Sequence, residues 1–303
     1  MAYKLAGLRI VSDFPLFWLP KCHELNGRHE VAIRHAPVPK TLLSVAGEFP
    51  NAQYNGNELL LKSPAAGRFL LRSGSEILID PEPSSAEGEI RSFLLGTAFG
   101  ALCHQRGILP LHSAVIDFEN FGCVAFIGPS GAGKSTLAAV LSARGHQVIA
   151  DDVCFLRAEE RGSVQAWPGL SRIRLWEHTL TALGHDGSRL ERELGGDNKY
   201  LIPTLPPESP TEPRPLRRIY QLHTGENGDD ARMDRLQGGA VLEALLQNVY
   251  RLSLAEYMGQ KPAAFGVCAA AALDIPAFRF TRPFDFGLLR EGIELLEGHL
   301  REI

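Results

Sequence analysis

The amino-acid sequence predicts an α/β fold in two parts: a smaller β-rich N-terminal domain over residues 1–85 and a larger α/β domain over residues 86–303. Three observations support this prediction. Up to about Pro83, short runs of β-forming residues alternate with turn residues. Between Ile90 and Leu102 the apolar residues then change to a helical spacing. After that, an apolar strand, a glycine-rich loop, a helix and a second strand follow one another, which is the order typical of α/β proteins.

The N-terminal domain is expected to be a mostly antiparallel sheet, because its apolar runs are separated by turns at hairpin-like spacing. The expected strands are Leu8–Val11, Val31–Ile33, Glu58–Leu61, Arg68–Leu71 and Glu76–Ile79.

The larger domain is expected to begin its core with two strands, a helix and a third strand, so that the strands on either side of the helix are parallel neighbours. These elements are Leu111–Asp117, Gly122–Ile127, the helix Lys134–Arg144 and the strand Gln147–Ala150. Further strands are expected at Leu170–Trp176 and Leu216–Leu222, and helices at Gly239–Leu254 and Phe286–Leu300. The proline-rich stretch Pro203–Pro215 predicts an extended, mobile connection.

Composition limits the classes of function. The 303 residues are 45% hydrophobic and 22% charged, which is typical of a globular protein with a packed core. A formal net charge of -4 gives no general basic field, so we expect no nucleic-acid partner. The five cysteines show no C-x-x-C pair and indicate neither a zinc site nor a disulfide framework. We find neither a signal peptide nor a long apolar run, and therefore expect a cytoplasmic protein without a membrane partner.

The glycine-rich loop fits the P-loop (Walker A) pattern G-x-x-x-x-G-K-[ST] and stands between an apolar strand and a helix, as the pattern requires. It consists of Gly128, Pro129, Ser130, Gly131, Ala132, Gly133, Lys134, Ser135 and Thr136. Its backbone amides and the helix N-terminus predict a polyphosphate site, which we assign to ATP. Lys134 would reach the β- and γ-phosphates, and Ser135, rather than Thr136, would ligate Mg²⁺.

Two adjacent acids, Asp151 and Asp152, follow the apolar run Val148–Ala150. Ligands of open α/β sheets bind at the carboxyl ends of the strands, and neighbouring residues of a strand point to opposite sides. One acid is therefore placed to meet a metal and the other an acceptor hydroxyl. The plainer interpretation is that both are solvated turn residues, or that Asp152 caps a turn. His112 by itself is more typical of a structural histidine than of a catalytic one.

Three segments together resemble the catalytic core of the HPr kinase/phosphorylase family: Leu111–Val115, Gly128–Thr136 and Arg144–Asp152. The resemblance implies a P-loop core of HPr kinase type in which His112 lies beside the transferring phosphate. It also implies that one of Asp151 and Asp152 is the general base while the other helps to hold Mg²⁺. We take Asp151 as the base and Asp152, with Ser135, as the metal ligand.

A second resemblance, over Gly7–Leu16 and Leu216–Leu222, is to a branch of HPr-kinase-like proteins that includes kinases of lasso-peptide precursors. It implies that the acceptor is a serine on a short peptide. The acidic-arginine-glycine signature of the bifunctional enzymes is not matched in Pro168–Trp176, so the resemblance does not imply phosphorylase activity, which is left open. Arg172 and Arg174 in this segment either neutralise the transferring phosphate or are exposed strand charges.

Lys199 lies between two flexible stretches and is a candidate to close over the γ-phosphate in the way an arginine finger does. The alternative is a solvated loop lysine. Asn198 and Lys199 match part of the guanine-recognition pattern N-K-x-D, but position 201 is leucine, which favours ATP.

The sequence therefore predicts a kinase that transfers the γ-phosphoryl group of Mg-ATP to a serine hydroxyl of a peptide or protein. Two alternatives stay open, a small-molecule kinase and a non-catalytic ATP-binding or ATPase assembly module. Homo-oligomerisation is also left open.

Overall fold

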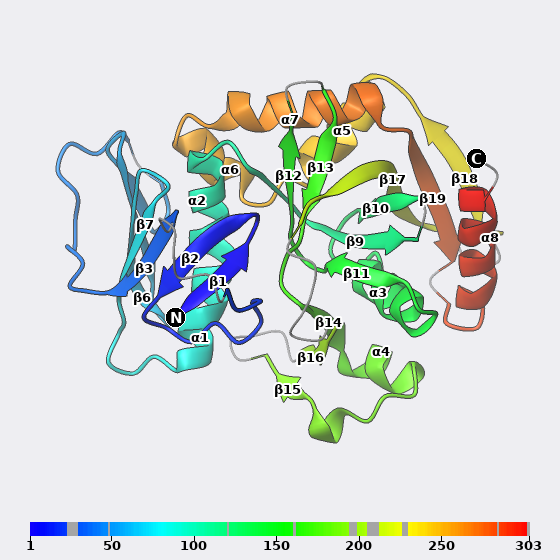
Figure 1. The fold of residues 1–303 in the computed structure, drawn as a ribbon, viewed down its shortest axis with the longest axis horizontal. Coiled ribbons are helices and arrows are strands. Elements are labelled where there is room, and N and C mark those ends of the chain that lie inside the picture. Colours follow the sequence, from blue (N-terminus) through cyan, green and yellow to red (C-terminus); the bar gives the residue numbers. More distant parts are fainter. Residues whose placement is uncertain are drawn as a thin grey trace.

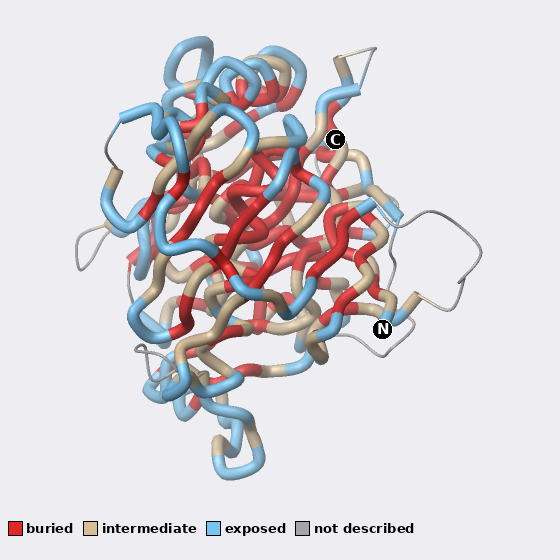
Figure 2. The backbone as a smooth tube through the Cα atoms, turned by 90° about the vertical axis from the view of Figure 1, so that its left-hand side faces the viewer, coloured by how far each residue is buried: buried red, intermediate tan, exposed pale blue. Residues whose placement is uncertain are grey.

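The computed structural model describes residues 1–22, 30–47, 49–119, 121–159, 162–193, 199–204, 212–225, 230–283 and 285–301. Over these residues the chain forms a mixed α/β structure with three sheets and helices packed against them (Figure 1). Buried backbone is concentrated in the central strands, while the connecting segments around them are mostly exposed (Figure 2).

The N-terminal part of the chain forms a seven-stranded sheet that contains all five strands expected there. Its strand order is β1 (Ala2–Leu5), β2 (Leu8–Ser12), β3 (Val31–His35), β7 (Glu76–Asp80), β6 (Gly67–Arg72), β5 (Glu58–Ser63) and β4 (Ala52–Tyr54). The β2–β3 and β3–β7 pairs are parallel and the others are antiparallel.

A nearly continuous helical segment follows this sheet and packs against it (Figure 1). It consists of α1 (Glu87–Phe93), a π-helical turn (Leu94–Ala98) and α2 (Phe99–Gln105). The rings of Phe69 on β6 and Phe93 on α1 lie 4.8 Å apart, and Leu94 and Phe99 are fully buried in the same core. Phe155 of the larger sheet belongs to this core as well, so the boundary near residue 85 stays a prediction.

The larger sheet has nine strands, of which six form its central part in the order β11, β9, β10, β17, β19 and β18. Their bounds are β11 (Gln147–Ala150), β9 (Ser113–Phe118), β10 (Gly122–Ile127), β17 (Arg214–Gly225), β19 (Ala277–Pro283) and β18 (Arg232–Leu236). The remaining strands continue from the start of β17 and are β13 (Val164–Trp167), β12 (Cys154–Ala158) and β8 (Leu109–Leu111).

Helices cover both faces of this sheet because its strands are apolar on both sides. The core on one face contains residues of α3 (Lys134–Ala143) and α8 (Leu289–Arg301). The core on the other face contains residues of α5 (Gly239–Gln247) and α7 (Lys261–Asp274).

The expectation that the strands on either side of α3 are neighbours is wrong. β9 lies between β10 and β11 and pairs antiparallel with both. The reason is the short connection after Phe118, which folds β9 back against β10 as a hairpin and leaves β11 to pair with the other edge of β9. Because both are antiparallel to β9, β10 and β11 still point in the same direction and end at the same side of the sheet. The parallel neighbour of β10 is β17.

The C-terminal helices also differ from the expectation. The segment Gly239–Leu254 is not one helix, because α5 ends at Gln247 and α6 (Leu252–Tyr257) begins after Arg251, whose φ of 57° is left-handed. The sequence prediction missed α7, and α8 begins at Leu289 rather than at Phe286.

The remaining sheet is small and three-stranded. It contains β14 (Arg172–Trp176), as expected, together with β16 (Lys199–Pro203) and β15 (Glu191–Arg192), and α4 (Glu177–Ala182) follows β14. The ends of the proline-rich stretch lie in β16 and β17, while residues 205–211 of that predicted mobile connection are outside the described residues. Within the described ranges, no helix has both the length and the apolar character needed to cross a membrane.

Candidate functional site

The glycine-rich loop, residues 128–133, joins the end of β10 to the start of α3. Gly128, Gly131 and Gly133 have φ values of 145°, 84° and 85°, a backbone conformation that residues with a side chain rarely adopt. No side chain caps the N-terminus of α3. The first amides of the helix are therefore available to an anion, and the loop fits the polyphosphate predicted from the sequence.

Lys134 is the first residue of α3 and is only 6% exposed. Its ammonium donates hydrogen bonds to the carbonyl oxygens of Gly128, at 2.6 Å, and Pro129, at 3.0 Å. Burial lowers the pKa of Lys134 to about 8, and the charges of Asp151 and Asp152 oppose this shift. A buried cation thus lies against the loop, close enough to both acids to interact with them electrostatically.

Asn248, which the sequence analysis missed, connects the loop to two other elements. Its side-chain oxygen accepts a hydrogen bond from the Gly128 amide at 2.9 Å, and its side-chain nitrogen donates to the carbonyl of Ala244 at 2.8 Å. Its own carbonyl accepts from the His112 amide at 2.7 Å. Asn248 therefore fixes the start of the loop relative to α5 and to the residue before β9.

Arg282 on β19 supports the loop from the other side and was also missed. Its guanidinium donates to the carbonyl of Ala132 at 3.1 Å and lies so close to Gly133 that a side chain at position 133 would displace the guanidinium. Burial lowers the pKa of Arg282. This contact adds a second buried positive charge next to the glycine-rich loop.

Asp151 follows β11 directly and is 2% exposed. Its Oδ2 accepts a hydrogen bond from the Arg174 amide at 2.9 Å, while its buried Oδ1 has no hydrogen-bond partner in the described part of the chain. Burial raises the pKa of Asp151 to about 6, and the nearby charge of Asp152 adds to this rise. The Arg174 amide and the Ser135 hydroxyl oppose it, because both favour the carboxylate.

Asp152 points to a different set of partners and has a left-handed φ of 78°. Its Oδ2 lies 2.7 Å from Nη1 of Arg174, whose guanidinium also pairs with Glu193 at 2.6 Å. The side chain of Arg174 is thus a bridge between two carboxylates, and the interpretation of Arg174 as an exposed strand charge is wrong. Its half-buried guanidinium is neutralised by these two acids.

His112 lies beside Asp152, as its Nδ1 is 2.8 Å from the Asp152 carbonyl oxygen. Since a carbonyl only accepts, Nδ1 carries the proton in the neutral ring. Burial and the charge of Lys134 lower the pKa of His112, so the neutral ring is favoured. The structure brings His112, both aspartates and Lys134 into one cluster.

Arg172 and Lys199 lie at the border of this cluster. The guanidinium of Arg172 lies 5.8 Å from the Trp18 ring. Burial lowers the pKa of Arg172. The ammonium of Lys199 lies 4.8 Å from the Trp176 ring, and its charge contributes to the lowered pKa of Lys134. Asn198, the other residue of the partial N-K-x-D pattern, is outside the described residues.

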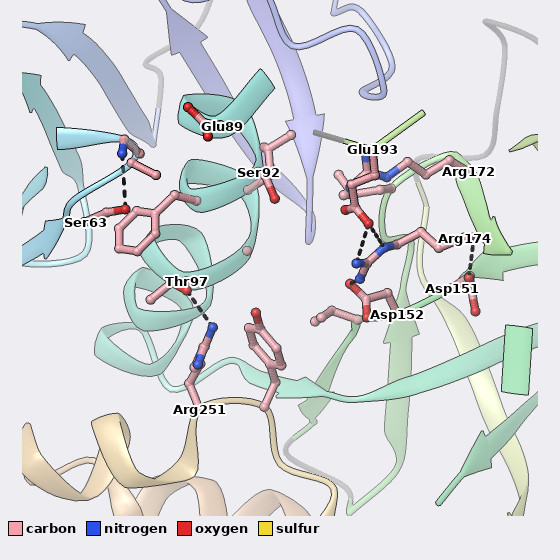
Figure 3. Close-up of a pocket in the computed structure, with 18 of the residues that line it drawn as sticks. Ser63, Glu89, Ser92, Thr97, Asp151, Asp152, Arg172, Arg174, Glu193 and Arg251 are labelled. Atoms are coloured by element: carbon pink, nitrogen blue, oxygen red, sulfur yellow. Dashed lines mark hydrogen bonds and ion pairs between the residues drawn. The ribbon is translucent and has the colours of Figure 1, made fainter. Parts of the chain in front are cut away.

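A cavity of about 480 Å³ opens in front of the two aspartates (Figure 3). Asp151, Asp152, Arg172, Arg174 and Glu193 form one side of it. The other side comes from the turn after β5, the helix α1 with its π-helical turn, and the segment before α6. A hydroxyl compound in this cavity would lie next to carboxylates that are close to the glycine-rich loop.

Ser135 and the aspartates form the candidate magnesium site. Among the described residues, no group of three or more histidine, cysteine, aspartate or glutamate side chains is arranged to hold a metal ion. Magnesium in nucleotide sites is usually held by one or two protein oxygens together with phosphates and water, and Ser135 beside Asp151 offers oxygens of this kind.

No family model matches the chain, and no curated protein matches it. Among solved structures, it is similar to the Hpr(Ser) kinase/phosphatase from Coxiella burnetii, with 14% identity and a TM-score of 0.34. The match covers 64% of this chain and 97% of that one.

Replacing Asn248 tests the anchoring of the loop. In Asn248→Ala the buried Gly128 amide loses its acceptor, which typically costs about 1–3 kcal/mol. We expect ATP affinity to fall roughly 10-fold, as measured by isothermal titration calorimetry. Gln247→Ala, one residue earlier and on the exposed side of α5, is the matched control and should bind as the parent does. Unchanged affinity in Asn248→Ala would show that the loop does not need this contact.

The lowered pKa of Lys134 predicts a pH dependence of ATP binding. Below about pH 8 the side chain is an ammonium, whereas above it the neutral amine increasingly replaces the charge that attracts phosphate. Affinity should therefore decrease as pH rises from 7 to 9. Lys134→Arg keeps its charge over this range, so its affinity should be nearly constant. Equal pH profiles for the parent and Lys134→Arg would contradict the assignment.

Proposed function

We propose that this protein is an ATP-dependent phosphotransferase that phosphorylates a serine hydroxyl. The observation that carries the proposal is the single cluster in which the buried Lys134, on an open phosphate-binding loop, interacts with both Asp151 and Asp152. When bound, Mg-ATP would supply the γ-phosphoryl group and the charge neutralisation that the metal provides. The residues of this chain would bind the nucleotide, orient the acceptor and take up its proton.

The residues Gly128–Thr136 would hold the phosphates of ATP through their amides, and Lys134 would add its charge. In the proposal its ammonium leaves the loop carbonyls for the phosphates, while Arg282 and Asn248 keep the loop backbone in place. We assign Ser135 and Asp152 to magnesium on the basis of the sequence resemblance.

Asp151 is assigned as the general base. A carboxyl group with a pKa of about 6 is ionised at neutral pH and still basic enough to accept the proton of a serine hydroxyl. Its Oδ1 has no hydrogen-bond partner among the described residues and is the oxygen that would accept this hydrogen bond. The nearness of Asp151 to Ser135 favours the opposite assignment, in which Asp151 holds the metal and Asp152 is the base.

His112, Arg172 and Lys199 are assigned supporting roles. A neutral His112 beside Asp152 would orient the aspartate and contact the transferring phosphate. Arg172 and Lys199 would stabilise negative charge that develops during transfer, since both border the cluster and carry charge in a partly buried setting.

A serine on a short peptide is the acceptor we propose, and a lasso-peptide precursor is the particular case that the sequence resemblance favours. The cavity of about 480 Å³ supports this choice, because it accommodates a narrow chain better than the surface of a folded protein. The same volume is also typical of small-molecule pockets, so a small-molecule kinase is the second candidate. A cytoplasmic location, where ATP is available, is part of the proposal.

The proposal predicts different defects for the lysine and the aspartate. Lys134→Ala should lose ATP binding, whereas Asp151→Asn should keep it and lose transfer by about two orders of magnitude or more, the usual contribution of a general base. Transfer is measured with labelled ATP and serine-containing precursor peptides, and the phosphate is located by mass spectrometry. Asp234→Asn, an exposed aspartate on β18, is the matched control and should transfer at the parent rate.

Transfer by Asp151→Asn at the parent rate would rule out Asp151 as the base. The same assay on Asp152→Asn then distinguishes the opposite assignment. ATP hydrolysis that is independent of any added hydroxyl compound would favour an ATPase module over a kinase.

A further inference from the structure

The side of the cavity that faces away from the aspartates carries one arginine, Arg251, which lies across from Arg174 and Asp152 (Figure 3). It stands between α5 and α6, three residues after the loop anchor Asn248. Arg251 has no part in the nucleotide binding, metal binding or proton transfer proposed for the site.

Arg251 is held in an unusual conformation. Its φ of 57° is left-handed, which costs a residue with a side chain free energy and persists only where the surroundings enforce it. Its guanidinium lies 5.1 Å from the Tyr250 ring and donates a hydrogen bond to the Thr97 hydroxyl at 2.9 Å. Thr97 lies in the π-helical turn Leu94–Ala98, and such turns are frequent at functional sites.

In the described part of the chain the Arg251 guanidinium contacts the Thr97 hydroxyl and the Tyr250 ring, and no carboxylate lies within 4.0 Å of it. Several of the other charges around the cavity have partners of their own, and Arg172 lies on the side of the aspartates. Arg174 is shared by Asp152 and Glu193, and Glu89 accepts a hydrogen bond from the Ala86 amide at 3.1 Å at the start of α1. Arg251 is therefore the cation on this side that a ligand would meet.

We propose that the cavity is the binding site of the acceptor peptide and that Arg251 binds a carboxylate that flanks the reacting serine. This inference rests on the proposed kinase function and specifies its substrate class as serine peptides with a nearby acidic residue. The serine would face Asp151 and Asp152, and the acidic side chain would face Arg251 on the opposite side. Thr97 and Tyr250 would hold the guanidinium in position, which lowers the entropy lost on binding.

The test uses the full-length protein and a panel of serine peptides that differ only in an acidic, neutral or basic residue at successive positions around the serine. For the parent protein we expect a preference for acidic peptides. Arg251→Gly suits the left-handed backbone, so the fold should be kept. This variant should raise KM for the acidic peptides roughly 10-fold, with kcat and the KM for ATP nearly unchanged.

Charge reversal gives the sharper outcome. Arg251→Glu should favour basic peptides over acidic ones, which a loss of stability alone would not produce. Arg290→Glu makes the same change of charge on α8, where Arg290 is 83% exposed, and should keep the preference of the parent. Thermal unfolding and circular dichroism of each variant show that the fold is intact.

The outcomes separate this inference from the proposed function. Phosphorylation of peptides without an acidic preference, or with a preference that Arg251→Glu leaves unchanged, would overturn the role of Arg251 and leave the kinase function standing. Absence of phosphorylation on every peptide, with ATP still bound, would overturn peptide kinase activity and this inference with it.

Discussion

Burial of opposite charges beside one another is the constraint on which the site depends. Asp151 and Lys134 are almost completely buried, and each would be costly to ionise alone. Burial raises the pKa of Asp151 to about 6, a rise that the Arg174 amide and the Ser135 hydroxyl oppose. Burial lowers the pKa of Lys134 to about 8, and the charges of Asp151 and Asp152 oppose this shift. Both groups are therefore mainly charged at neutral pH. The second acid, Asp152, forms an ion pair with Arg174. The cluster therefore contains a positive charge that attracts phosphate and a carboxylate that can accept the proton of a hydroxyl group.

The order of strands in the larger sheet brings these charges together. β10 and β11 are separated by β9 but end at the same side of the sheet, so the loop after β10 and the acids after β11 lie close in space. The segment between α5 and α6 reaches the same place. Asn248 fixes the loop there, and Arg251, three residues later, lies beside the cavity. One short segment thus contacts both the proposed nucleotide site and the proposed acceptor site.

Local patterns were sufficient to predict the strand Gly122–Ile127, the loop after it and the start of the next helix, because glycine spacing and apolar periodicity are encoded by neighbouring residues. Contacts between distant residues were not predictable in this way. Asn248 is 120 residues from the amide that it binds, and Arg282 is 150 residues from its carbonyl partner. The sequence also did not indicate that the helical segment is interrupted at Arg251, because arginine occupies the left-handed position where glycine is usual. The roles of the site residues stay predictions.

A crystal structure with Mg²⁺ and a non-hydrolysable ATP analogue is the most direct test of the central claim. The account predicts the β- and γ-phosphates on the amides at the start of α3, with the Lys134 ammonium moved from the carbonyls of Gly128 and Pro129 to the phosphates. The γ-phosphate would face the cavity that contains Asp151 and Asp152. A nucleotide bound elsewhere, with Lys134 still on the loop carbonyls, would contradict the account.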